Sequence, residues 1–310
     1  MKKIFMIILL LTSLITFSNI DIYDTNNQAY NQVMKVFTSK KTNKEKIESL
    51  KYLEKAGNNT FFSESALVAL YKAENENDKA NEIMDKINEL NNEELKDNFN
   101  LLVAKYLMLD LDRKEDSVEM LNDLILSKFN YIRSKAYILY YEYCEYNSDL
   151  ENMLLCLKEA GKDKDNYLMV SNKYTQVYEF EKDLYQFLKE NCLNATDEET
   201  MKIILTFSIL NKDKIVTDKI IKRLNKKKID FKSDVNAAKK ILNVNQVLDE
   251  SEKYSKLALL NNEKKAYVTL ALITYYRGNI DAAIQYLKEA KKNNVSGADN
   301  LIKLYKDLKK

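Results

Sequence analysis

The sequence predicts an all-α protein, and three observations lead to this prediction. The 310-residue chain contains no proline and only four glycines, and these are the residues on which hairpin turns and strand ends most depend. No stretch alternates apolar and polar residues for long enough to indicate a strand. Similar segments also recur at multiples of roughly 33 residues, which is the length of a repeated pair of helices.

The N-terminal segment has the layout of a secretory signal peptide. Lys2 and Lys3 precede an apolar run from Ile4 to Phe17, and Thr16 and Ser18 are small residues suitably placed for cleavage after Ser18. The run is shorter than the roughly 20 residues that span a bilayer. We therefore predict a signal peptide over residues 1–18 and an exported protein, periplasmic or extracellular, with no stable membrane span after cleavage. An uncleaved anchor or a buried N-terminal helix is the alternative.

Export would leave a chain without net charge. The whole sequence has 49 basic and 47 acidic side chains, and cleavage would remove Lys2 and Lys3 but no acid. A neutral chain has no general attraction for polyanions. The sequence therefore predicts no nucleic-acid partner.

The missing residues also narrow the chemistry. Without histidine, the chain cannot use a Ser-His-Asp triad, a histidine base or a histidine-ligated metal. Cys144, Cys156 and Cys192 form no Cys-x-x-Cys pair, and the four glycines lie too far apart for a phosphate-binding loop. We therefore predict no catalytic residues, no cofactor and no metal site.

An internal repeat is expected over residues 19–297. Leu53, Leu157 and Leu287 lie in similar segments and are 104 and 130 residues apart, which correspond to three and four steps of roughly 33–35 residues. Gly57 and Gly161 end two of these segments, where a left-handed residue often follows a helix. Equivalent apolar positions predict about eight units: Leu53, Met84, Leu121, Leu157, Leu188, Leu224, Leu257 and Leu287.

Each unit is predicted to contain two amphipathic helices. In the first unit, Tyr30, Val33, Met34 and Phe37 share one helical face, and Ile47, Leu50 and Leu53 share a face of the partner helix. Polar clusters with capping residues separate the helices, at residues 42–44, 74–78, 147–149 and 277–279. The segment 298–310 is predicted to be a C-terminal capping helix, with an apolar side that covers the last repeat: Leu301, Leu304, Tyr305 and Leu308.

Residues 264–297 resemble a tetratricopeptide repeat. The resemblance is carried by Tyr267, Leu270, Ala271, Gly278, Ala283, Leu287 and Ala290. Thr274 stands where an aromatic residue is usual, the proline that commonly follows the second helix is absent, and earlier segments match more loosely, least of all residues 165–260. The resemblance implies a right-handed superhelical solenoid of antiparallel helix pairs, in which the first helix of each pair lines a concave groove.

Matching by position gives a candidate peptide-binding groove. The last repeat would contribute Lys265, Val268, Leu272, Tyr275 and Tyr276, and a tyrosine-rich unit would contribute Glu142 and Tyr146. Tyrosine and apolar side chains are common anchors for peptides. For most of the six tyrosines of that unit, packing between helices is the favoured interpretation: Tyr131, Tyr137, Tyr140, Tyr141, Tyr143 and Tyr146.

Cys144 and Cys156 are expected on facing helices of one unit. An exported protein permits a disulfide between them, and two buried reduced thiols are the alternative. Their spacing in the sequence does not decide between the two.

These observations predict a non-catalytic scaffold that binds a protein or peptide in the cell envelope or outside the cell. Two alternatives stay open. One is a cell-envelope enzyme, such as a glycan hydrolase, in which a helical superhelix surrounds a buried carboxylate of raised pKa. The other is a structural homo-oligomeric component of the envelope.

Overall fold

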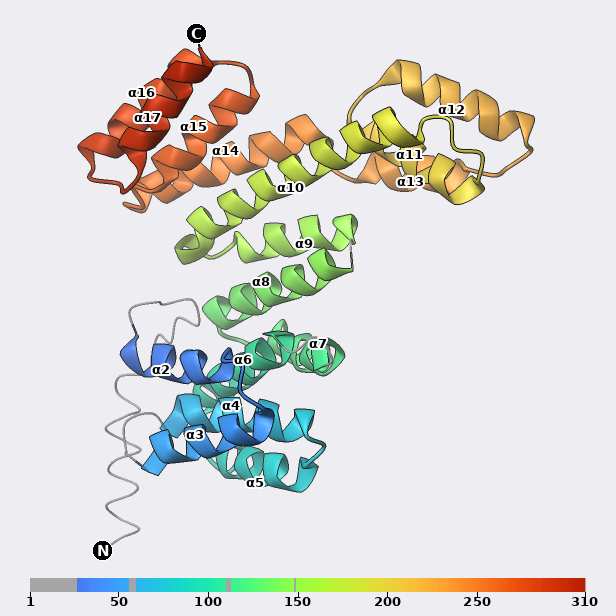
Figure 1. Cartoon of the computed structure of the whole chain (residues 1–310). Coiled ribbons are helices and arrows are strands. Elements are labelled where there is room, and N and C mark those ends of the chain that lie inside the picture. Colours follow the sequence, from blue (N-terminus) through green and yellow to red (C-terminus); the bar gives the residue numbers. More distant parts are fainter. Residues whose placement is uncertain (1–26, 56–59, 110–112, 148, 310) are drawn as a thin grey trace, which may run out of the picture. The chain divides into compact units, whose positions relative to one another are not determined.

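The described part of the chain is entirely helical apart from its turns. The computed structural model describes residues 27–55, 60–109, 113–147 and 149–309, and no strand occurs within these ranges. The all-α prediction is therefore confirmed (Figure 1). The predicted signal peptide, residues 1–18, lies outside the described residues, as does Gly57. Within the same ranges, no helix combines the length and apolar character needed to cross a bilayer.

The chain divides into two compact units, Met1–Tyr143 and Cys144–Lys310. In the first unit, α4 packs against α3, α5 and α6, and α6 packs against α7. The predicted first helix pair is present, because Tyr30, Val33 and Phe37 are buried on α2 and Leu50 on α3. The helices of this unit are α2 (Gln28–Phe37), α3 (Asn43–Lys55), α4 (Thr60–Ala73), α5 (Asn77–Asn88), α6 (Glu93–Leu109), α7 (Lys114–Leu124) and most of α8 (Asn130–Tyr146).

The second unit contains the last three residues of α8 and all later helices. Its longest helix, α10, continues directly into a π-helical turn, η3. The elements are α9 (Leu150–Ala160), η2 (Lys164–Asn166), α10 (Tyr167–Phe187), η3 (Leu188–Cys192), α11 (Glu198–Leu210), α12 (Lys214–Lys226), α13 (Lys232–Lys240), α14 (Val244–Leu260), α15 (Ala266–Tyr276), α16 (Ile280–Lys292) and α17 (Ala298–Leu308).

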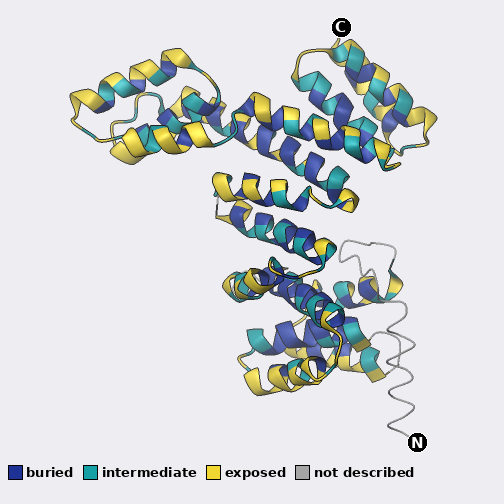
Figure 2. Ribbon diagram, turned by 180° about the vertical axis from the view of Figure 1, so that it is seen from behind, coloured by how far each residue is buried: buried dark blue, intermediate teal, exposed yellow. Residues whose placement is uncertain are grey.

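The main helix pair of the second unit joins segments that are distant in the sequence. α10 packs along α14, whereas α11, α12 and α13 pack mainly on one another. These three helices share a core with η3 and the end of α10, in which Ile204, Leu205 and Ile220 are fully buried. Figure 2 shows buried residues along α10 and α14 and long exposed stretches on α12 and α13. The sequence predicted evenly spaced units across Leu188, Leu224 and Leu257. The structure instead has one long helix pair, α10–α14, with helices α11–α13 inserted between its two members in the sequence.

Buried hydroxyl groups explain why α10 and α14 pair. The hydroxyls of Ser171 and Ser251 each donate to the other residue's backbone carbonyl at 2.8 Å. Thr175 and Ser255 extend this ladder, with hydroxyl distances of 2.7 Å to Ser251 and 2.5 Å to Ser171. All four side chains are buried. Small residues allow the helices to approach closely, and the satisfied hydroxyls fix their register.

The turns explain how a chain with so little glycine can reverse direction. Gly278 has φ +80° between α15 and α16, and the next N–H, that of Asn279, donates to the carbonyl of Thr274 at 3.0 Å. This is the hydrogen bond of a Schellman helix end. The same bond follows five other residues with positive φ, none of them glycine: Asn75, Lys212, Lys228, Asn262 and Asn294.

Gly161 does not adopt the left-handed conformation that the sequence predicted for it. Its φ is −71°, which any residue can adopt. A β-carbon at this position would instead overlap the ring of Tyr254 on α14. The glycine is therefore needed for space and not for backbone freedom.

The segment that resembles a tetratricopeptide repeat forms the hairpin of α15 and α16. Ala271, Ala283 and Leu287 are buried in a cluster with Tyr305 of α17, and Ala290 is buried on α16. The final helix covers this hairpin with only part of its apolar side, because Tyr305 is buried but Leu304 and Leu308 are each 51% exposed.

Candidate functional site

The five candidate residues of the last repeat form one strip along α15. Lys265 is exposed at the N-cap, and Val268, Leu272, Tyr275 and Tyr276 are half-buried. The opposite side of the helix is buried through Ala266, Thr269, Leu270, Ala271 and Ile273. No charged residue occurs between Ala266 and Tyr276. Beyond Lys265, the helix therefore presents apolar and tyrosine side chains where a surface helix usually presents charge. We call Lys265, Val268, Leu272, Tyr275 and Tyr276 together the α15 strip.

Two members of the α15 strip are held by neighbouring rings. Tyr276 packs on Tyr178 of α10, with ring centroids 5.0 Å apart, and Tyr275 packs on Tyr305 of α17 at the same distance. The rings of Tyr275 and Tyr276 also contact each other, at 5.8 Å. The four tyrosines thus form a continuous row that connects α10, α15 and α17.

The hydroxyl of Tyr276 is also fixed. It donates a hydrogen bond to a carboxylate oxygen of Glu179 on α10. Burial, and then this hydrogen bond, raise the pKa of Tyr276. Sequence reasoning missed Glu179 and Tyr178 because they lie in the stretch that carries little repeat signature.

The middle of the α15 strip is its least constrained part. Val268 contacts the apolar cluster beneath α17, while Leu272 lies on the half-exposed side between the two tyrosine contacts. Arg277, just beyond the helix, forms ion pairs with Asp249 at 2.7 Å and with Glu252. Lys265, at the other end, supplies an exposed positive charge.

Most tyrosines of helix α8 are at least partly buried, as the favoured packing interpretation predicts. Of its six tyrosines, Tyr141 is fully buried, four are half-buried, and Tyr146 is 59% exposed. Glu142 is half-buried. Glu142 belongs to the first compact unit, whereas Tyr146 and α15 belong to the second.

A second apolar surface lies on α10 and was not predicted. Phe180 and Phe187 are 44% and 56% exposed, and their seven-residue spacing places them on the same side of the helix. The spacing is visible in the sequence, but it falls in the region of weak repeat signature.

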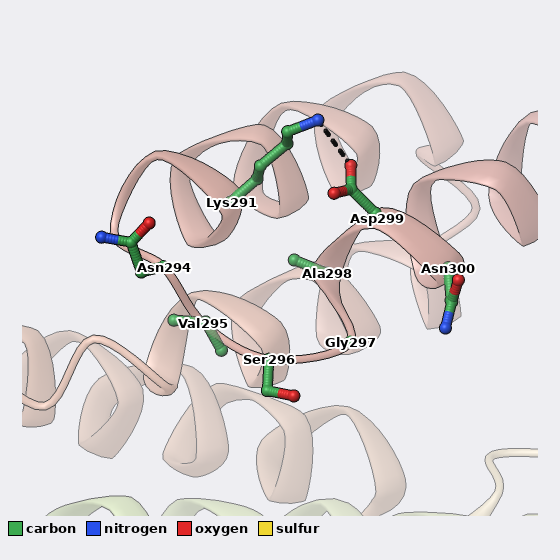
Figure 3. A pocket seen from close by; sticks show the side chains of 8 residues that line it. All are labelled: Lys291, Asn294, Val295, Ser296, Gly297, Ala298, Asp299 and Asn300. Carbon is green, nitrogen blue, oxygen red and sulfur yellow. Dashed lines mark ion pairs between the residues drawn. The ribbon is translucent and has the colours of Figure 1, made fainter.

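Two shallow pockets lie outside these surfaces. One, of about 370 Å³, is formed by the loop before α17 and includes an ion pair between Lys291 and Asp299 at 2.7 Å (Figure 3). The other, of about 450 Å³, lies between the end of α10 and the turn before α12. There, Asp213 accepts hydrogen bonds from Lys189 at 2.8 Å and Tyr185 at 2.7 Å, and the Lys189 bond is the main cause that lowers the pKa of Asp213 to about 2.

Two carboxyl groups have strongly raised pKa values, but neither lines a pocket described above. Burial raises the pKa of Glu181 on α10 to about 8, and neither of its oxygens has a hydrogen-bond partner among the described residues. Burial, followed by repulsion from Glu54, raises the pKa of Glu64 on α4 to about 7. Glu181 has no exposed surface, so a substrate cannot reach it in this conformation.

The described residues contain no group of three or more potential metal ligands. No protein-family model, curated protein or solved structure matches the chain significantly.

Proposed function

We propose that this chain is a non-catalytic scaffold that binds a protein or peptide along the α15 strip. The observation that carries the proposal is the half-exposed, uncharged side of α15, which is flanked by the tyrosine row and by the positive charge of Lys265. Rigid aromatic and aliphatic side chains lose little entropy when a partner covers them. The burial of the small residues between α15 and α16 supports a tetratricopeptide-like packing of this helix pair.

The partner would match the chemistry of the strip. Val268 and Leu272 favour aliphatic or aromatic anchors, and Lys265 favours an acidic group at one end of the bound segment. An amphipathic helix or an extended peptide with an acidic flank meets both requirements. The basic start and apolar run of residues 1–18 support binding after export, in the periplasm or outside the cell.

The test uses variants that spare the tyrosine row. Binding peptides would be selected from a displayed random library with the full chain, and their affinity measured by fluorescence anisotropy. Leu272→Glu places a charge in the centre of the strip and is expected to weaken binding by about tenfold or more. Lys265→Glu is expected to weaken binding of acidic peptides selectively.

The matched control is Leu260→Glu, because Leu260 is 82% exposed at the end of α14, outside the strip. Circular dichroism would verify that each variant is folded. Equal affinities for wild type, Leu272→Glu and Leu260→Glu would refute the site. Cross-linking and affinity capture of the wild-type chain from its own cell envelope would then identify the natural partner.

Self-association is the second candidate function, and the half-exposed Leu304 and Leu308 on the final helix favour it. If α17 joins two copies, the mass measured by light scattering should rise with protein concentration, and Leu304→Glu should abolish the rise. A monomeric mass at every concentration would contradict this assignment and leave peptide binding unaffected.

A further inference from the structure

The charge of the chain is unevenly distributed and is most positive in the α11–α13 insertion. Residues 212–240, which contain α12 and α13, have eleven basic and four acidic side chains, a net charge of +7, whereas the whole sequence has a net charge of +2. A local excess of one sign creates a field that attracts counter-charges even where the molecule as a whole is nearly neutral. The insertion is therefore a positive segment in a chain without a general attraction for polyanions.

This positive charge is not neutralised by the described part of the chain. None of the eleven cations forms an ion pair with a carboxylate there. Two of the four acids are paired instead with lysines outside the segment, Asp213 with Lys189 at 2.8 Å and Asp234 with Lys202 at 3.9 Å. The lysines of the segment therefore remain available to an external anion.

The outward side of α12 brings several of these lysines together. Val216, Ile220 and Leu224 bury one side of the helix, and the other side is exposed (Figure 2). Steps of four, three and four residues place an apolar side chain and three lysines along that side: Ile215, Lys219, Lys222 and Lys226. We call these four residues the α12 lysine face. Ile215 is 84% exposed, and Asp218, the one acid of the helix, lies at the edge of the face.

The type of cation indicates a broad anionic surface as the partner. Ten of the eleven cations are lysines, which act as hydrated point charges, whereas arginine forms the paired hydrogen bonds of specific phosphate or base recognition. The one arginine, Arg223, is occupied within the chain. Its guanidinium donates to the backbone carbonyls of Leu193, at 2.6 Å, and Ala195.

The α12 lysine face suits a lipid bilayer better than nucleic acid or a peptide. Single-stranded nucleic acid stacks on exposed aromatic rings, but the two aromatic residues of the insertion, Phe207 and Phe231, are half-buried against its core. Peptides are usually held in grooves or pockets, and no residue of the face lines either pocket described above. At a bilayer, the exposed Ile215 can enter the headgroup region while the lysines contact lipid phosphates.

We propose that the α12 lysine face binds the surface of an anionic phospholipid membrane, with Ile215 inserted between the headgroups. The binding is peripheral and depends mainly on the attraction between lysine ammonium groups and lipid phosphates. The α15 strip lies on a different helix. Membrane binding and peptide binding are therefore separate properties, and each can be lost without the other.

The test is co-sedimentation of the full chain with vesicles made of equal parts of phosphatidylcholine and phosphatidylglycerol, in comparison with vesicles of phosphatidylcholine alone. Binding to the neutral vesicles measures any contribution from the apolar run of residues 4–17. The proposal predicts much stronger binding to the anionic vesicles. Raising the ionic strength from about 0.1 M to about 1 M, which shortens the screening length from about 10 Å to about 3 Å, should remove most of this gain.

Variants of the face separate its two components. The combination of Lys219→Gln, Lys222→Gln and Lys226→Gln should weaken binding to the anionic vesicles by about 100-fold, because each lysine near an anionic surface strengthens binding by about fivefold. Ile215→Ser should weaken the same binding by about fivefold, since it removes the inserted apolar group. It should leave the salt dependence unchanged, because the charge is the same.

The matched control removes the same charge elsewhere in the second unit. Lys288→Gln, Lys303→Gln and Lys306→Gln change three exposed lysines of α16 and α17, and together they should weaken binding by less than about fivefold. Circular dichroism would verify that all variants are folded. The proposal is overturned if anionic vesicles are bound no better than neutral ones, or if the two triple variants bind them equally. It is also overturned if fluorescence anisotropy shows that double-stranded DNA or polyglutamate is bound more tightly than the anionic vesicles.

Discussion

At the scale of single residues, the surroundings of Gly161 restrict the size of its side chain, and the surroundings of Glu181 determine its protonation. Gly161 faces the ring of Tyr254, which is itself buried and stacked on Tyr174, with ring centroids 5.8 Å apart. The ring therefore has little freedom to move away. Glu181, in contrast, is a charged residue type that is buried without a hydrogen-bond partner among the described residues, and it keeps its proton near neutral pH.

Gly161→Ala is expected to destabilise the chain by about 1–3 kcal/mol, because the new methyl group would overlap the Tyr254 ring. Urea unfolding followed by circular dichroism would measure the change. In a Tyr254→Ala background the same substitution should cost much less. Equal costs in the two backgrounds would show that the ring is not the reason for the glycine.

Glu181→Leu should remove a pH dependence of stability. The pKa of Glu181 is about 8 in the folded chain against 4.5 for an ordinary glutamate, so the folded state binds the extra proton between these values and stability falls as pH rises through this window. Relative to wild type, the variant should gain stability, on the order of 4 kcal/mol, between pH 5 and pH 8.5. Urea midpoints at the two pH values provide the measurement, and parallel profiles would contradict the assignment.

At the scale of elements, the α10–α14 pair depends on small hydroxyl side chains. Ser251 donates to the carbonyl of Ser171, and its own carbonyl accepts from Ser171 in return. A larger side chain at this position would separate the two helices as well as break the bonds. The small side chains of the ladder therefore allow the two helices to approach closely, and their hydroxyls form the hydrogen bonds at the same contact.

Ser251→Ala should cost about 1–2 kcal/mol through the lost hydrogen bonds, and Ser251→Leu should add about 1–3 kcal/mol of overpacking to that loss. Urea unfolding gives both values. Ser208→Ala is the control, since Ser208 is equally buried on α11 and bonded to Thr217 but lies outside the pair. If Ser251→Leu were no more harmful than Ser251→Ala, close helix approach would not be the basis of the pairing.

The same elements show what the sequence could predict. Helix existence followed from periodicity, as on α2. The members of the α15 strip were instead chosen by matching positions with the tetratricopeptide repeat that residues 264–297 resemble. The α10–α14 pairing could not be predicted, because a repeat pattern assumes that neighbours in sequence pack together. The tyrosine row was missed because Tyr178 and Tyr305 come from helices on opposite sides of α15 in the sequence.

At the scale of the whole molecule, the α11–α13 insertion packs mainly on itself and shares its core with η3 and the end of α10. Local stability in such a segment can differ from that of the rest of the chain. Leu205→Ala, at a fully buried position, is expected to remove about 2–5 kcal/mol from this core. Amide hydrogen exchange should then accelerate in residues 198–240 and remain unchanged in α15 and α16. Uniform acceleration across the second unit would contradict an independent insertion.

The pairing of α10 with α14 also has a kinetic consequence. In an array where each helix contacts only the next, folding can propagate step by step along the chain. Here α10 pairs with α14, which follows residues 188–243 in the sequence. The pair can therefore form only after this intervening segment has folded back on itself. Non-local closure of this kind slows folding. Since the chain has no proline, no prolyl isomerisation overlaps with this step, and stopped-flow refolding should resolve it as a late phase that Ser251→Leu slows.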